Sequence, residues 1–166
     1  MKEFVENFEE KLQHFKKLID KAKEDLKKIE KELAAKKDEL LKIEEEIIAI
    51  SKEIKEREHR VHDILNKLKR IQKATLKAQT DREFEMLERD RARLLKELHQ
   101  HDKKLKELKE KYEKLTTKEM KLLDEEMELE KKKAKLLHKK ETYLQKLEQI
   151  MAKFQKRIDR FREMFS

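Results

Sequence analysis

Apolar residues recur along the first half of the chain in alternating steps of three and four. The run begins at Val5 and ends at Ile71, and only Lys36 and Arg57 interrupt it with charged side chains. This spacing averages 3.5 residues, so it keeps one narrow apolar stripe against a partner helix in a left-handed supercoil. We call the residues of this stripe the seam. The pattern predicts a long helix over residues 2–76, which we call the first arm.

The seam of the first arm can be written out in full. It consists of Val5, Phe8, Leu12, Phe15, Ile19, Ala22, Leu26, Ile29, Leu33, Lys36, Leu40, Ile43, Ile47, Ile50, Ile54, Arg57, Val61, Ile64, Leu68 and Ile71. The same alternation returns from Phe84 to Met164 and predicts a second arm over residues 81–164. The seam of this arm consists of Phe84, Leu87, Arg91, Leu94, Leu98, His101, Leu105, Leu108, Tyr112, Leu115, Glu119, Leu122, Glu126, Leu129, Lys133, Leu136, Lys140, Tyr143, Leu147, Ile150, Phe154, Arg157, Phe161 and Met164.

The two arms do not share one heptad phase. Phe84 is displaced by two residues from the phase that begins at Val5, and neither a three-residue nor a four-residue insertion produces that displacement. A reversal of the chain explains it, because each arm then adopts its own phase. At the end of the stretch of residues 73–81, where the alternation falters, Thr80-Asp81-Arg82-Glu83 matches a capping box, a signal for the start of a helix. We therefore expect a bend near residues 76–81.

Aromatic residues and charges favour an antiparallel hairpin. Folding near residue 80 would bring together the phenylalanines of the two chain ends, which are Phe4, Phe8, Phe15, Phe154, Phe161 and Phe165. If facing residue numbers sum to about 162, antiparallel packing also places Phe8 opposite Phe154 and Lys36 opposite Glu126. We expect an all-α fold, a long two-helix antiparallel coiled-coil hairpin. The alternative is one continuous helix in a parallel coiled-coil oligomer, because no Gly or Asn marks the bend.

Composition agrees with an elongated molecule. The chain has 166 residues, of which 51% are charged and 36% hydrophobic, and it contains no Gly, Pro, Cys or Trp. Such a chain has few turns and too little apolar surface for a compact core. We expect residues 1–166 to form a single elongated coiled-coil unit. The start of the chain does not resemble a signal peptide and no stretch is apolar enough to span a membrane, so we expect a cytoplasmic protein.

The sequence gives little support for an enzymatic function. There is no glycine for a phosphate-binding loop and no cysteine for a thiolate site. The heptad places His101 in the seam but turns His59 and His62 toward solvent, so these histidines cannot converge on a metal ion with His99. We expect no catalytic residues, no cofactor, no metal site and no small-molecule substrate, because two paired helices form no concave, dry site.

A wider apolar stripe in the second arm is the candidate site for a protein partner. Between Glu119 and Lys140 every other seam position is charged, while apolar residues spread to the adjacent positions. The candidate partner-binding residues are Met120, Leu123, Met127, Leu137, Leu144 and Met151. Two paired helices do not need this width, so we expect a further helix, from a second copy or from another protein. The expected function is that of a non-enzymatic stalk, spacer or adaptor.

Positive charge suggests an alternative function. The formal net charge is +8, although 46 basic residues are interleaved with 38 acidic ones. The C-terminal segment is a basic amphipathic helix whose candidate contacts to an anionic partner are Lys153, Lys156, Arg157 and Arg160. Such a helix would bind an anionic membrane, or nucleic acid through phosphates without base specificity.

A short segment resembles part of a known kind of protein. Residues 80–90, with the sequence TDREFEMLERD, are similar to an acidic-aromatic segment just past the bend of certain bacterial coiled-coil hairpin proteins. Those proteins carry a four-cysteine zinc ribbon, and the resemblance implies a flagellar or type III secretion chaperone. The two-arm layout also looks like the stalk proteins of secretion ATPases. This chain has no cysteine and therefore no ribbon. The resemblance implies a role associated with secretion or assembly.

Overall fold

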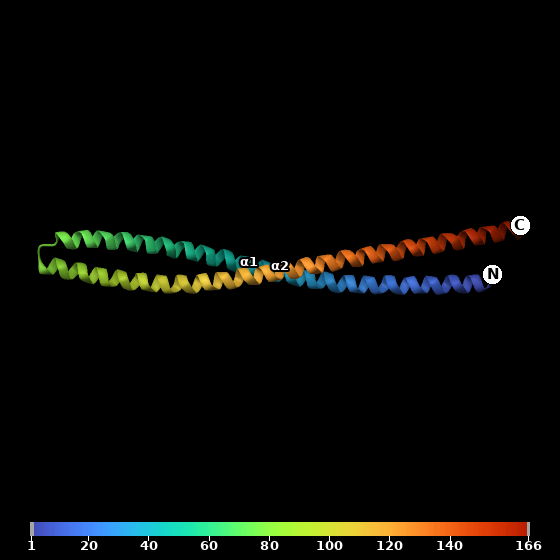
Figure 1. Cartoon of the computed structure of the whole chain (residues 1–166), viewed down its shortest axis with the longest axis horizontal. Helices are drawn as coiled ribbons and strands as arrows, with labels where there is room; N and C mark the ends of the chain where they lie inside the picture. The colour runs from blue at the N-terminus through green and yellow to red at the C-terminus, as the bar shows by residue number, and fades with distance from the viewer. Residues whose placement is uncertain (1, 166) are drawn as a thin grey trace. The chain divides into compact units, whose positions relative to one another are not determined.

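The computed structural model describes residues 2–165 and consists of two helices. Helix α1 spans Lys2–Lys77 and helix α2 spans Asp81–Phe165, and residues 78–80 join them (Figure 1). The described residues contain no strand. The predicted all-α hairpin with a bend within residues 76–81 is confirmed. The alternative of one continuous helix is wrong, because the chain leaves the helical conformation between Lys77 and Asp81.

The hairpin divides into two compact units. Unit 1 pairs the part of α1 up to Asp38 with the part of α2 from Leu122 onward, and unit 2 comprises Glu39–Lys121, including the bend. In unit 1 the beginning of α1, blue in Figure 1, runs beside the end of α2, red. That residues 1–166 act as a single elongated unit stays a prediction.

Burial follows the predicted seam closely in α1. Every seam position from Val5 to Ile71 is buried or half-buried. In unit 1 the buried core includes Ile29, Leu33 and Leu129, with Leu136 packed against it. These side chains are the main source of stability, because each fully buried leucine or isoleucine contributes roughly 1.5–3 kcal/mol.

The seam of α2 is less completely covered, and its exposed members lie mainly near the two ends of the helix. The exposed members are Phe84, Arg91, Tyr112, Arg157, Phe161 and Met164. Phe84 lies in the first turn of α2, only a few residues after the connection, where the opposing chain has already left α1. Phe161 and Met164 follow Phe154, whose ring already packs on Phe8 near the start of α1, so α1 runs out before it can cover them.

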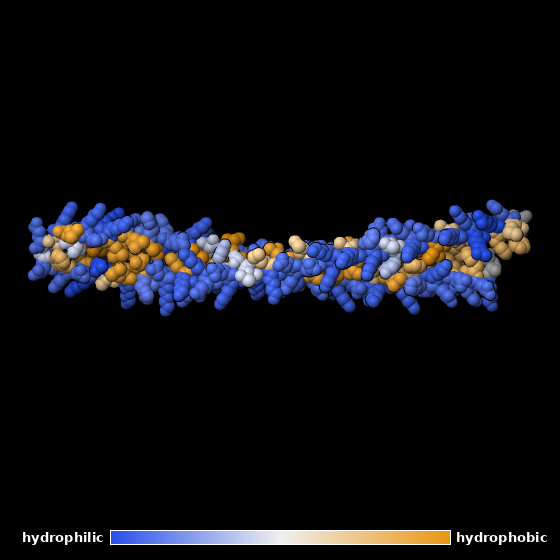
Figure 2. Space-filling view, viewed as in Figure 1, coloured by the Kyte–Doolittle hydropathy of each residue, from blue (hydrophilic) through white to orange (hydrophobic). Residues whose placement is uncertain are grey.

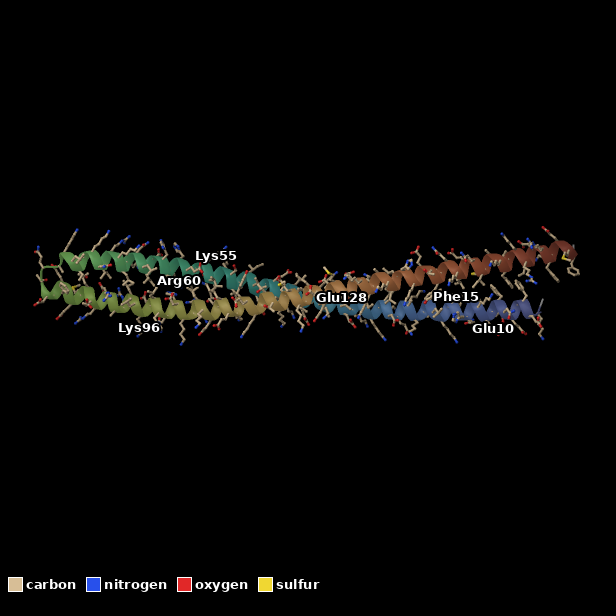
Figure 3. The ribbon with its side chains drawn as sticks, in the orientation of Figure 1. Glu10, Phe15, Lys55, Arg60, Lys96 and Glu128 are labelled. Carbon is tan, nitrogen blue, oxygen red and sulfur yellow. The ribbon has the colours of Figure 1, made fainter. Side chains whose placement is uncertain are left out.

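The predicted gathering of phenylalanines occurs in part. The ring of Phe154 stacks on Phe8 with centroids 3.8 Å apart and on Phe4 with centroids 5.5 Å apart. Phe15 instead lies 6.3 Å from the ring of Tyr143, on the side of α1 that faces α2 in Figure 3. Phe161 packs on Phe165, at 4.6 Å. The antiparallel register places Phe8 against Phe154 as predicted, but the six rings form separate contacts along unit 1 rather than one cluster.

Helix α2 begins with a capping interaction at the bend. The backbone N–H of Glu83 donates to Oγ1 of Thr80 at 3.2 Å, as the capping-box pattern predicts. The Glu83 carboxylate accepts from the N–H of Gln79 at 3.2 Å, one residue before the expected donor at Thr80. No residue within 2–165 has a positive φ, so the turn does not require glycine. The chain therefore reverses its direction without a glycine, and the absence of glycine from the sequence does not argue against the bend.

Neither helix is apolar enough over a sufficient length to cross a membrane, as judged from the described residues.

Candidate functional site

The six residues predicted to bind a partner are all exposed. Five lie in unit 1, and we call them the α2 apolar surface: Leu123, Met127, Leu137, Leu144 and Met151. Their exposed fractions range from 40% at Leu144 to 60% at Met127. The sixth residue, Met120, belongs to unit 2 and is also exposed. Large apolar side chains that remain half in water on one helix are typical of an interaction surface.

Helix geometry explains why this surface lies outside the hairpin. Each of its five members directly follows a seam residue of α2; for example, Leu137 follows Leu136 and Leu144 follows Tyr143. Successive residues of a helix point about 100° apart, because one turn takes 3.6 residues. The first residue of each pair therefore packs toward α1, while the second turns past the edge of the helix pair. The α2 apolar surface is not needed to close the hairpin.

The seam of α1 accommodates its lysine, Lys36, with an acidic partner on α2. The ammonium of Lys36 lies 2.6 Å from Oε2 of Glu125, and the two side chains keep 27% and 38% of their surface exposed. The expectation that Glu126 would bind this lysine is wrong by one residue. Heptad position sets where the backbone of a lysine lies, but its long stem carries the ammonium to the edge of the seam, where Glu125 projects. The charge thus stays partly in water, and no buried side-chain polar atom of residues 2–165 lacks a partner.

The second charged seam residue of α1, Arg57, lies in unit 2 against a histidine. Nη1 of Arg57 is 3.3 Å from Nδ1 of His101, and Nε of Arg57 is 3.4 Å from Oε1 of Glu53. His101 is half-buried, as its seam position predicts. His59 and His62 are exposed and contact Asp63 and Asn66 on their own helix, at 3.7 and 3.3 Å. Among the residues that the structure describes, no group of three or more metal-ligating side chains is positioned to hold an ion.

The structure brings the four predicted anion contacts together at the end of α2. Lys153, Lys156, Arg157 and Arg160 line one shallow hollow with Phe161 and Met164. We call this group the basic end. Phe161, Met164 and the neighbouring Phe165 are all exposed. The guanidinium of Arg157 also lies over the ring of Phe4, 4.2 Å from its centroid, which fixes that side chain against α1.

A third group of exposed apolar residues was not predicted. Near the bend, Leu65, Leu76, Met86 and Leu95 of unit 2 are exposed, and Leu65, Leu76 and Leu95 line a shallow groove that also contains Arg91. Figure 2 shows hydrophobic surface gathered toward the bend of unit 2. Leu65 and Leu95 each follow a buried seam residue, Ile64 and Leu94, so the rule that places the α2 apolar surface would also have found them.

Comparison of the chain with models of protein families, with curated proteins and with solved structures gave no match.

Proposed function

We propose that this protein is a non-enzymatic scaffold, a coiled-coil hairpin that acts as a stalk, spacer or adaptor through contacts with other helices. The observation that carries the proposal is the α2 apolar surface. Five large apolar side chains stand on one helix, outside the seam that closes the hairpin. Their exposure costs solvation free energy, roughly 25 cal/mol for each Å² that a partner could cover.

The spacing of these side chains indicates the kind of partner. Leu137, Leu144 and Met151 recur at intervals of seven residues, as in the seam itself. A stripe with this repeat fits the side of another α-helix better than a strand or a compact pocket. The similarity of residues 80–90 to the bend segment of secretion-associated hairpin proteins supports a role in assembling a larger complex.

Site-specific photo-cross-linking in cells tests this proposal. A photoreactive amino acid in place of Leu144 is expected to give discrete cross-linked products, because this position faces a bound helix. Gln149 is the matched control, since it is exposed and lies on the same helix but outside the apolar surface. Identical products from both positions, or none from either, would contradict the proposal.

A second candidate function rests on the basic end. Four cations surround a hollow beside three exposed apolar side chains, Phe161, Met164 and Phe165. This combination favours an anionic membrane over nucleic acid, because apolar side chains enter a lipid interface while the cations attract its charged headgroups.

Co-sedimentation with vesicles tests the membrane hypothesis. Binding is expected to vesicles that contain phosphatidylserine, to weaken as salt is raised, and to disappear when Lys153, Lys156 and Arg160 are replaced by glutamate. Vesicles of phosphatidylcholine alone are the control. Equal binding to both kinds of vesicle, or a stronger affinity for single-stranded DNA than for the anionic vesicles, would contradict the hypothesis.

A further inference from the structure

The α2 apolar surface has the spacing of a second seam. Ala134 and three glutamates complete the stripe on the same face of the helix. In alternating steps of four and three, the stripe consists of Leu123, Met127, Glu130, Ala134, Leu137, Glu141, Leu144, Glu148 and Met151. This is the alternation that a helix presents to another helix in a coiled coil. The glutamates in the stripe restrict which helix can fit, because a glutamate directly opposite another glutamate is destabilising.

Charge is strongly segregated along the same part of α2. Residues 124–130 contain five acidic residues and no basic one, whereas residues 131–140 contain six lysines and no acidic one. When two copies of this segment run antiparallel, each acidic block lies beside the basic block of the other copy. When they run parallel, acid lies beside acid and lysine beside lysine, which costs free energy.

We propose that the part of the α2 apolar surface around Met127 and Leu137 binds the same part of a second copy of this chain, in antiparallel orientation. The inference rests on the proposed function and names the partner. The two-fold axis passes near residue 132, so facing residue numbers sum to about 264. In this register Met127 packs on Leu137 of the second copy, and Glu130 lies opposite the small Ala134.

Other arrangements are less favourable. Parallel pairing places Glu130, Glu141 and Glu148 each opposite its own counterpart. An antiparallel register shifted by seven residues, with facing numbers that sum to about 271, places Glu130 opposite Glu141 and moves the acidic block away from the lysines. In the proposed register the lysines at 131–133 of the two copies lie near the axis and repel each other. Lys131 already pairs with Glu128 of its own helix at 3.6 Å, and this pair offsets part of the repulsion.

Sedimentation equilibrium of the purified protein tests the association. The wild-type chain is expected to approach twice its monomer mass of 20.4 kDa as concentration rises. Replacement of Leu137 by glutamate should weaken dimerisation at least tenfold, because it places a charge against Met127 and beside the acidic block. Met86→Glu is the matched control: Met86 is an exposed apolar residue of α2, at 59% compared with 47% for Leu137, but it lies in unit 2.

Circular dichroism of each variant shows whether the hairpin remains helical. A wild-type chain that stays monomeric at every concentration would overturn the proposal, as would equal weakening of the dimer by Leu137→Glu and Met86→Glu.

Single-cysteine variants test the orientation, since the chain has no native cysteine. A mixture of Met127→Cys and Leu137→Cys chains is expected to form the mixed disulfide on oxidation, because these positions face each other across the antiparallel pair. Met127→Cys chains alone should remain largely uncross-linked. A rapid disulfide between two Met127→Cys chains would establish parallel pairing and overturn the proposal.

This test and the one for the proposed function fail separately. A monomeric purified protein that still gives discrete products from position 144 with a different protein would leave the scaffold role standing and remove the second copy as its partner.

Discussion

At the scale of single residues, heptad position decides whether a leucine stabilises the hairpin or faces water. Leu40 and Leu41 are neighbours in α1, yet their exposed fractions are 6% and 57%. The first lies in the seam and the second lies one position past it. The same step separates Leu136 from Leu137 and Ile64 from Leu65. An apolar residue directly after a seam residue is therefore available for other contacts.

Truncation of leucines on and off the seam should have very different effects. Leu33 is only 4% exposed and packs in the core with Ile29 and Leu129. We expect Leu33→Ala to lower the free energy of unfolding by about 2–4 kcal/mol, because it removes buried methyl groups and leaves a gap. Leu41→Ala should change it by less than about 0.5 kcal/mol. Urea denaturation followed by circular dichroism measures both, and similar losses for the two variants would contradict the assignment of the seam.

The ion pair of Lys36 and Glu125 should contribute modestly. Both side chains keep about a third of their surface in water, where screening weakens their attraction. A double-mutant cycle with Lys36→Ala and Glu125→Ala is expected to give a coupling free energy of about 0.2–1 kcal/mol, smaller still at high salt. A coupling above about 3 kcal/mol would contradict the picture of a half-exposed pair, because only buried pairs reach that size.

At the scale of elements, the start of α2 depends on Thr80. Its hydroxyl and the Glu83 carboxylate satisfy two N–H groups at the bend, those of Glu83 and Gln79. A second match to the capping pattern, Thr-Thr-Lys-Glu at residues 116–119, lies inside α2. There Thr116 and Thr117 donate their hydroxyls to the carbonyl of Glu113 instead. The same four-residue pattern is a cap in one place and helix interior in the other.

This difference gives a matched pair of threonine variants. We expect Thr80→Ala to lower the free energy of unfolding by about 0.5–2 kcal/mol, because it removes the cap. Thr116→Ala should be neutral or slightly stabilising, because alanine is the better helix former in a helix interior. Thr80→Ser should retain most of the stability. Thermal or urea unfolding distinguishes the three, and a larger loss from Thr116→Ala than from Thr80→Ala would show that the cap is unimportant.

The elements themselves could be predicted because their signals repeat many times. Each step from Val5 to Ile71 independently supports one seam, and all of these positions are buried or half-buried, which shows that the period was the right one. The bend could be placed because the change of phase and the Thr80 cap coincide. The antiparallel register followed from facing residue numbers that sum to about 162, which place Phe8 opposite Phe154, and the centroids of these two rings lie 3.8 Å apart.

What could not be predicted depends on single side-chain tips and on the ends of helices. The heptad fixes the backbone of Lys36 but not which of two adjacent glutamates its flexible stem reaches. It assigns Phe84 and Phe161 to the seam without knowing whether the opposite helix extends far enough to cover them. The groove with Leu65 and Leu95 could not be predicted from a wide apolar stripe on one helix, because its apolar residues come from both α1 and α2.

At the scale of the whole molecule, the surfaces left for partners depend on the seam being closed within one chain. A seam satisfied by the chain's own second helix leaves for partners the residues beside it, among them the α2 apolar surface, and the uncovered end of α2, which carries the basic end. Both lie on α2 in unit 1. If the seam instead paired different chains, the apolar residues beside it would have other neighbours, and the proposed partner contacts would lose their basis.

A chain with cysteine in place of both Phe8 and Phe154 tests this claim most directly. The two native rings lie 3.8 Å apart, so the replacement thiols should come within reach of each other. We expect dilute oxidation to give a disulfide within one chain, which migrates at the monomer mass of 20.4 kDa and joins the two terminal peptides after proteolysis. Disulfides that form only between chains, with the thiols of one chain too far apart to react, would contradict the hairpin and the account built on it.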